Sequence, residues 1–207
     1  MEKASRSSFI DSAAVQGRSV ASVLLLIVIA AVFALPGSAA RLAMIKETLM
    51  KSVSGEDIVE LGRREIEKGL EARRHWGSMV AAVNPSLTSF EVNEIGRAVL
   101  RYSSQYELPP QLLVAIIMVE SNGRVFAVSP KGAEGLMQVM PFWKSELGIE
   151  GTLFDIDNNI RAGAHILAEY IRERGFENGI ARYYRGNLPV SGQAYIGKVQ
   201  KAMQSIS

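Results

Sequence analysis

The strongest constraint on the fold is an unbroken run of apolar side chains from Leu112 to Val119 that ends on a carboxylate. Eight consecutive apolar residues indicate an element that is buried on most sides. Periodicity alone fits a buried strand as well as a buried helix. Pro109 and Pro110 favour the helix, because proline suits a first helical turn, where a missing N–H costs nothing. The sequence therefore predicts a buried helix from about Pro110 to about Ser121.

Glu120 is the first ionisable group to follow this run. A carboxyl group in a poorly solvated wall has a raised pKa, because burial disfavours its charged form. Such a group stays protonated closer to neutral pH and can act as a general acid. The alternative is that Glu120 is simply the exposed last-turn residue of a core helix.

A polar loop punctuated by glycines follows Glu120. Gly123, Gly132 and Gly135 allow tight turns or a close approach of the backbone to a ligand. Ser129 offers a hydroxyl group and Gln138 an amide, and these groups suit carbohydrate better than phosphate. The loop therefore favours a sugar-binding role beside the carboxylate.

Taken together, these residues and several later ones resemble the soluble-lytic-transglycosylase (SLT) domain family. The first matches are Glu120-Ser121, Ser129, Gly135-Leu136-Met137-Gln138 and Met140-Pro141. The later ones are Leu153-Phe154-Asp155, Asn159-Ile160, Ala162-Gly163, Ala181, Tyr183, Gly186, Tyr195-Ile196 and Lys198-Val199. The resemblance covers roughly Thr88 to Val199, and its specificity lies in the ordered set rather than in any one pair.

The resemblance implies a mainly α, lysozyme-like domain that cleaves peptidoglycan glycan strands. It implies that Glu120 acts first as acid and then as base, and that the product carries a 1,6-anhydromuramoyl end. Ser129, Gln138, Met140 and Tyr183 are then expected to bind or position the substrate. No cofactor and no metal is implied.

One departure from the family pattern falls beside Tyr183. The family usually has asparagine and a small residue there, where this chain has Tyr184 and Arg185. The departure puts the geometry of the glycan subsites in doubt. Two alternatives therefore stay open: a lysozyme-type hydrolase on the same fold, and a peptidoglycan-binding assembly factor without catalysis.

Ordinary glycosidases need a second carboxylate at a set distance from the first. On composition alone, Glu134, Asp155 and Asp157 are candidates, but none stands at a matching family position. The alternate spacing of the aspartates also resembles a calcium loop, yet Ile160 and Ile166 replace its glycine and its bidentate glutamate. We instead interpret Asp157 or Asn158 as a helix cap.

The first 40 residues predict export from the cytoplasm. Basic residues precede an apolar run over residues 20–35, and the small residues over 36–40 form a pattern that signal peptidase cleaves. A cleaved signal is favoured, and an uncleaved anchor in the inner membrane is the alternative, since the run is short for a span. Either version predicts a periplasmic location.

The remaining chain divides into two predicted parts. Residues 41–86 have apolar residues at helical intervals between charged ones, which predicts an amphipathic helical extension. Residues 87–207 form the predicted catalytic domain, whose first helix is capped by Thr88 or Ser89 with Glu91 close behind. A short helix from Pro141 and helices near 160–171, 177–184 and 193–203 complete the expectation.

Composition limits the partners. The formal net charge is +2 and cysteine is absent, so neither a nucleic-acid partner nor a disulfide or thiolate metal site is indicated. A short catalytic domain with a helical extension is compatible with an enzyme that opens the wall locally, for example for a secretion or conjugation apparatus.

Overall fold

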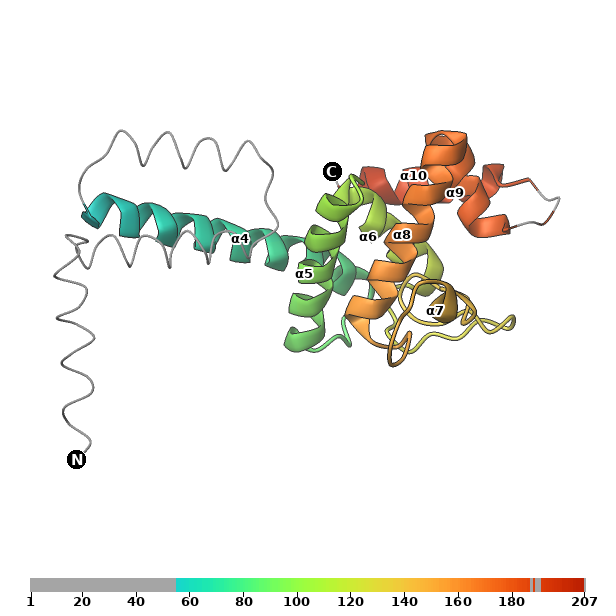
Figure 1. Cartoon of the computed structure of the whole chain (residues 1–207), viewed down its shortest axis with the longest axis horizontal. Helices are drawn as coiled ribbons and strands as arrows, with labels where there is room; N and C mark the ends of the chain where they lie inside the picture. The colour runs from blue at the N-terminus through green and yellow to red at the C-terminus, as the bar shows by residue number, and fades with distance from the viewer. Residues whose placement is uncertain (1–54, 187, 189–190, 207) are drawn as a thin grey trace, which may run out of the picture. The chain divides into compact units, whose positions relative to one another are not determined.

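The structure is a computed structural model that describes residues 55–186, 188 and 191–206. Over these residues it is helical, with isolated β-bridges as the sole strand pairing (Figure 1). The helices are α4 (Gly55–Val83), α5 (Ser89–Gln105), α6 (Pro110–Ser121), α7 (Trp143–Glu146), α8 (Ile156–Arg174), α9 (Phe176–Arg185) and α10 (Gln193–Ile206). The predicted mainly α class is confirmed. The predicted export signal lies outside the described residues.

The chain divides into two compact units between Leu70 and Glu71, within α4. In the first unit, Glu60 pairs with Arg63 and Arg64 on the exposed surface of α4, as expected for an amphipathic extension. None of the helices in the described ranges has both the length and the apolar character to cross a membrane. The predicted division at residues 40 and 86 stays a prediction.

The second unit begins with the C-terminal part of α4, which packs closely on α5. A Cβ atom added to Gly96 of α5 would lie 1.9 Å from the carbonyl oxygen of Arg73, so the contact requires glycine. The predicted cap of α5 is confirmed: Thr88 Oγ1 accepts from the Glu91 N–H, and the Glu91 carboxylate accepts from the Thr88 N–H.

Helix α6 is the centre of this unit and has the predicted bounds. Its residues 112–117 are fully buried, and it packs against α5 and α10. It ends at Asn122, which takes the left-handed conformation. Asn122 Nδ2 donates to the Val83 carbonyl at 3.0 Å, and Asn84 Nδ2 donates to the Gly123 carbonyl at 3.0 Å. The end of α6 is therefore tied to the end of α4 from both sides.

The cap of α8 corrects one expectation. Asp155, rather than Asp157 or Asn158, is the N-cap, and its side chain accepts from the Asn158 N–H at 2.9 Å. Asp157 lies in the first turn, where it accepts from the Tyr102 hydroxyl at 2.5 Å and from Arg97 at 3.2 Å. These partners on α5 engage Asp157, so the preceding aspartate caps the helix.

Asn159 on α8 fixes the loop that follows α6. Its Nδ2 donates to the Glu134 and Leu153 carbonyls at 2.8 and 2.7 Å, and its Oδ1 accepts from the Met137 N–H at 2.7 Å. Gly135 lies against this amide with a φ of 76°, and an added Cβ would lie 2.3 Å from Asn159 Nδ2. The loop conformation therefore depends on a buried amide and a glycine.

We expect Asn159→Ala to lower the free energy of unfolding by about 3 kcal/mol, because three buried backbone groups would lose their partner. Urea denaturation would measure the loss. Asn93→Ala is the matched control, since Asn93 is exposed and bonds only within its own helix. Equal stability of the two variants would contradict this account of the loop.

Candidate active site

A cavity of about 480 Å³ opens in the second unit where α6 ends. This volume lies in the range of small-ligand pockets. Its wall combines polar and aromatic side chains from α6, the following loop, α7, α8 and α9. The residues that line it are Glu120, Ser129, Lys131, Ala133, Gln138, Val139, Met140, Phe142, Trp143, Ile166, Tyr170, Arg182, Tyr183, Tyr184, Arg185, Gly186 and Leu188. All five residues predicted for the site, Glu120, Ser129, Gln138, Met140 and Tyr183, thus line one cavity.

Glu120 sits in the wall of the cavity on the last turn of α6. The Tyr195 hydroxyl of α10 donates to its Oε1 at 2.5 Å. Burial raises the pKa of the Glu120 carboxyl above its ordinary value, and the hydrogen bond from Tyr195 acts in the opposite direction. The arrangement produces a sheltered acid that keeps one specific hydrogen-bond partner.

Sequence reasoning listed Tyr195 among the matches to the family but gave it no role in the site. It is buried and its ring stacks on Tyr184 of α9, with centroids 4.7 Å apart and an interplanar angle of 14°. The sequence feature that could have indicated its role is its position, as a tyrosine on the apolar face of the last helix. Its partner lies 75 residues earlier, so the pattern alone did not connect the two.

Ser129 and Gln138 use part of their hydrogen-bonding capacity within the loop. Ser129 Oγ accepts from the Ala133 N–H at 2.9 Å, which leaves its O–H to donate. Gln138 Nε2 donates to the Gly135 and Ala127 carbonyls at 3.0 and 3.3 Å, which leaves its carbonyl oxygen to accept. The cavity therefore presents one hydroxyl donor and one amide acceptor in fixed positions.

Tyr183 ties α9 to the same loop. Its hydroxyl donates to the Met137 carbonyl at 2.8 Å, so it is Tyr195 that directly contacts the acid. Burial raises the pKa of Tyr183 well above its ordinary value, and the nearby Glu120 adds to this. Met140 and Trp143 contribute apolar and aromatic surface, and Trp143 also packs on the core.

The other acidic candidates lie away from this cavity. Glu134, Asp155 and Asp157 do not line it, and the two aspartates serve the cap of α8 and the contact with α5. Among the described lining residues, Glu120 is the one carboxylate. Within the described ranges, no cluster of three or more histidine, cysteine or acidic side chains forms that could hold a metal.

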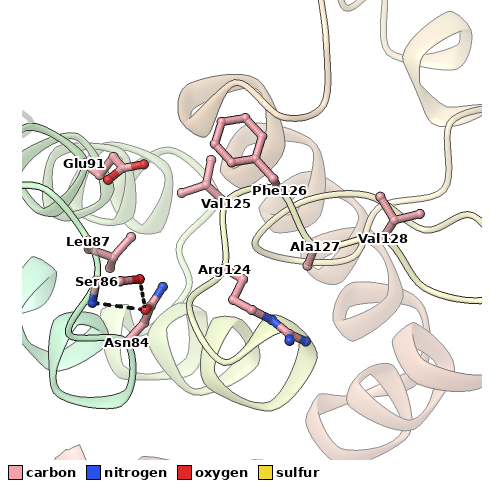
Figure 2. A pocket seen from close by; sticks show the side chains of 9 residues that line it. All are labelled: Asn84, Ser86, Leu87, Glu91, Arg124, Val125, Phe126, Ala127 and Val128. Carbon is pink, nitrogen blue, oxygen red and sulfur yellow. Dashed lines mark hydrogen bonds between the residues drawn. The ribbon is translucent and has the colours of Figure 1, made fainter.

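A second depression of about 400 Å³ provides a contrast (Figure 2). Its carboxylate, Glu91, already accepts from Thr88 in the helix cap. Arg124 donates to the Ser121 carbonyl. Ser86 donates from its N–H and its hydroxyl to Asn84 Oδ1, as the dashed lines in Figure 2 show. The fold itself uses these polar groups, so the cavity at Glu120 is the better candidate site.

Comparisons with known proteins find similarity over part of the chain. The family described as "Transglycosylase SLT domain" matches residues 97–195, just under half of the chain. A protein named "Transglycosylase" from Enterobacteria phage PRD1 is 36% identical over 104 residues, which are 48% of this chain and 39% of that protein.

Two solved structures are also similar. The 70-kDa soluble lytic transglycosylase SLT70 from Escherichia coli gives a TM-score of 0.42 at 25% identity, over 67% of this chain and 26% of that one. The 70-kDa soluble lytic transglycosylase in complex with bulgecin A gives 0.41 at 22% identity, over 82% and 33%. The chain thus spans well under half of each of these relatives.

The fold and the site together define a class of protein. It is a helical domain in which the described wall of one cavity holds a single sheltered carboxylate beside a polar loop. Residues 97–195 match the transglycosylase SLT domain family. The resemblance to this family that the residue pattern indicated is confirmed over that range. The individual roles of the five predicted site residues stay predictions.

Replacing Glu120 by glutamine should stabilise the protein increasingly as pH rises. Below the ordinary carboxyl pKa the two side chains are both neutral, whereas above the raised pKa of Glu120 the native wild type must hold a buried charge. We expect Glu120→Gln to gain about 1–3 kcal/mol at the alkaline end, the range for a poorly solvated polar group. Denaturant midpoints from pH 4 to 9 would measure it.

The control is Glu146→Gln, which removes an exposed carboxylate on α7. Its stability relative to the wild type should change little over the same range. A constant offset for both variants would contradict the burial of the Glu120 charge.

Proposed function

We propose that the chain is a peptidoglycan lytic transglycosylase that cleaves the β-1,4 bond between N-acetylmuramic acid and N-acetylglucosamine. The observation that carries the proposal is one sheltered carboxylate, Glu120, in a cavity whose described wall holds no second one. Hydrolysis by the usual routes needs two carboxylates at set separations. A route in which the substrate supplies its own nucleophile needs one.

In the proposed reaction Glu120 first acts as the acid. It gives its proton to the glycosidic oxygen, the bond from that oxygen to C1 of the muramoyl residue breaks, and N-acetylglucosamine leaves as an alcohol. The carbonyl of the muramoyl N-acetyl group stabilises the positive charge on C1. The Glu120 carboxylate then takes the proton of the C6 hydroxyl, whose oxygen bonds to C1. The product is a 1,6-anhydro ring, formed without water, and the acid is restored.

The surrounding groups support these steps in the proposal. The Tyr195 hydroxyl holds the carboxyl in one orientation and stabilises its charged form in the second step. The remaining O–H of Ser129 and the carbonyl of Gln138 are free to bond the N-acetyl group and sugar hydroxyls. The aromatic side chains suit the apolar faces of pyranose rings.

Product analysis tests the proposal. Digests of peptidoglycan by the full chain should contain fragments lighter by one water than the products of a hydrolase, and Glu120→Gln should abolish them with a loss of at least about 10³-fold. Mass spectrometry would measure both. Reducing muramic ends alone would instead establish the lysozyme-type alternative. Binding to the wall with no soluble product would establish the non-catalytic factor.

Tyr195→Phe should shift the pH profile in a defined direction. The hydrogen bond from Tyr195 lowers the pKa of Glu120, so its removal raises that pKa further. The acid must be protonated to react, so the limb of kcat/KM that falls with rising pH should move to higher pH. We also expect kcat to fall about tenfold, because the carboxyl loses its orientation. Tyr106→Phe is the control, since Tyr106 lies outside the cavity.

We also propose that the chain acts in the periplasm. The support is the basic, apolar and small-residue pattern of residues 1–40. Cell fractionation of the full chain would test this, and N-terminal sequencing would separate a cleaved signal near residue 40 from a retained membrane anchor. Recovery in the cytoplasm with the N-terminus intact would contradict it.

A further inference from the structure

The cavity at Glu120 carries cationic side chains that the proposed bond cleavage does not use. Arg182 and Arg185 reach it from α9, and Lys131 reaches it from the loop after α6. Glu120 is the single carboxylate among the described lining residues. The wall therefore carries an excess of positive charge, which favours an anionic group in the bound ligand.

The side chain of Arg185 is unpaired among the described residues. Its Nε is buried and donates to no acceptor there. Over the residues that the structure describes, its guanidinium makes neither a hydrogen bond nor an ion pair, and it is not paired with Glu120. A buried donor without an acceptor costs about 1–3 kcal/mol. Such an arrangement is explained when a ligand supplies the acceptor.

An arginine in the last turn of a helix ordinarily caps its C-terminal carbonyls, and on α9 Arg182 rather than Arg185 has this role. A cation in the last turn of a helix stabilises the terminal carbonyls. On α9 it is Arg182 that does so, because its Nη1 donates to the Gly186 carbonyl at 2.5 Å. Its guanidinium also lies over the Tyr170 ring, 5.4 Å from the centroid. Helix capping therefore does not account for Arg185.

Arg185 directly follows a residue that contacts the support of the acid. Tyr184 stacks on Tyr195, whose hydroxyl donates to Glu120, so Tyr184 and Arg185 adjoin the residues that hold the acid. A group bound by Arg185 lies in the same cavity as the reacting carboxyl.

We propose that Arg185, together with Lys131, forms an anion subsite that binds a carboxylate carried by the muramoyl part of the substrate. Guanidinium groups bind carboxylates through two parallel hydrogen bonds, and lysine adds a point charge. This inference rests on the proposed function. In strands without peptide the carboxylate is that of the lactyl ether, and in substituted strands the attached peptide supplies carboxylates. The subsite selects acidic glycan over neutral polymers of N-acetylglucosamine.

Binding measurements on the full chain test the subsite, with Glu120→Gln as background so that ligands stay intact. Three oligosaccharides of equal length are compared by calorimetry: alternating sugars with free lactyl carboxylates, the same sugars with peptides attached, and a neutral chitin oligomer. Adding Arg185→Gln should weaken at least one acidic ligand about tenfold relative to the chitin oligomer. The acidic ligand that loses more affinity identifies the source of the carboxylate.

Two further variants complete the test. Arg185→Lys should retain part of the preference, and Arg174→Gln, which removes an exposed cation at the end of α8 outside the cavity, should retain all of it. Thermal unfolding midpoints establish that each variant is folded.

Equal weakening toward the acidic and neutral ligands, or no change, would overturn the subsite. These outcomes are distinct from failure of the proposed function. That failure is a wild type that yields no anhydro product, whatever its preference among the three ligands.

Discussion

The site depends on a balance at one carboxyl group. Burial in the wall of the cavity disfavours the charge of Glu120, while the hydroxyl of Tyr195 favours it. The effects of burial and of this hydrogen bond on the pKa of Glu120 both depend on a constant separation between α6 and α10. The fully buried residues 112–117 supply that rigidity, because a close-packed core resists small displacements. The apolar run that determines the fold thus also determines the chemistry of the acid.

The loop after α6 shows how a polar site can be rigid. Asn159 holds its backbone from α8, and the Tyr183 hydroxyl holds it from α9. Backbone groups of the loop bond to the Ser129 oxygen and to the Gln138 Nε2 group. The Ser129 O–H then remains as a donor for a ligand, and the Gln138 carbonyl oxygen remains as an acceptor. Such preorganisation lowers the entropy cost of ordering a sugar.

Local patterns predicted the helices well, and long-range contacts explain the rest. The bounds of α6 followed from an apolar run and two prolines, and the cap of α5 followed from Thr88 and Glu91. Asp157 or Asn158 was expected to cap α8, whereas Asp155 does so, and Asp157 instead contacts Tyr102, 55 residues away. Tyr195 could be placed on a helix face but not assigned to Glu120. Sequence periodicity predicts which face of a helix carries a side chain, but the contacts of that side chain depend on how the helices pack.

The contact between Arg73 and Gly96 has a consequence for how such domains are exchanged in evolution. The matched family region begins at residue 97, yet the compact unit begins at Glu71, and Asn84 and Asn122 link its first helix to the end of α6. A recombination event that cut at the family border would divide α5 and remove Gly96. It would also leave the Gly123 carbonyl without its donor and Asn122 Nδ2 without its acceptor. The heritable module is therefore larger than the stretch that sequence similarity delimits.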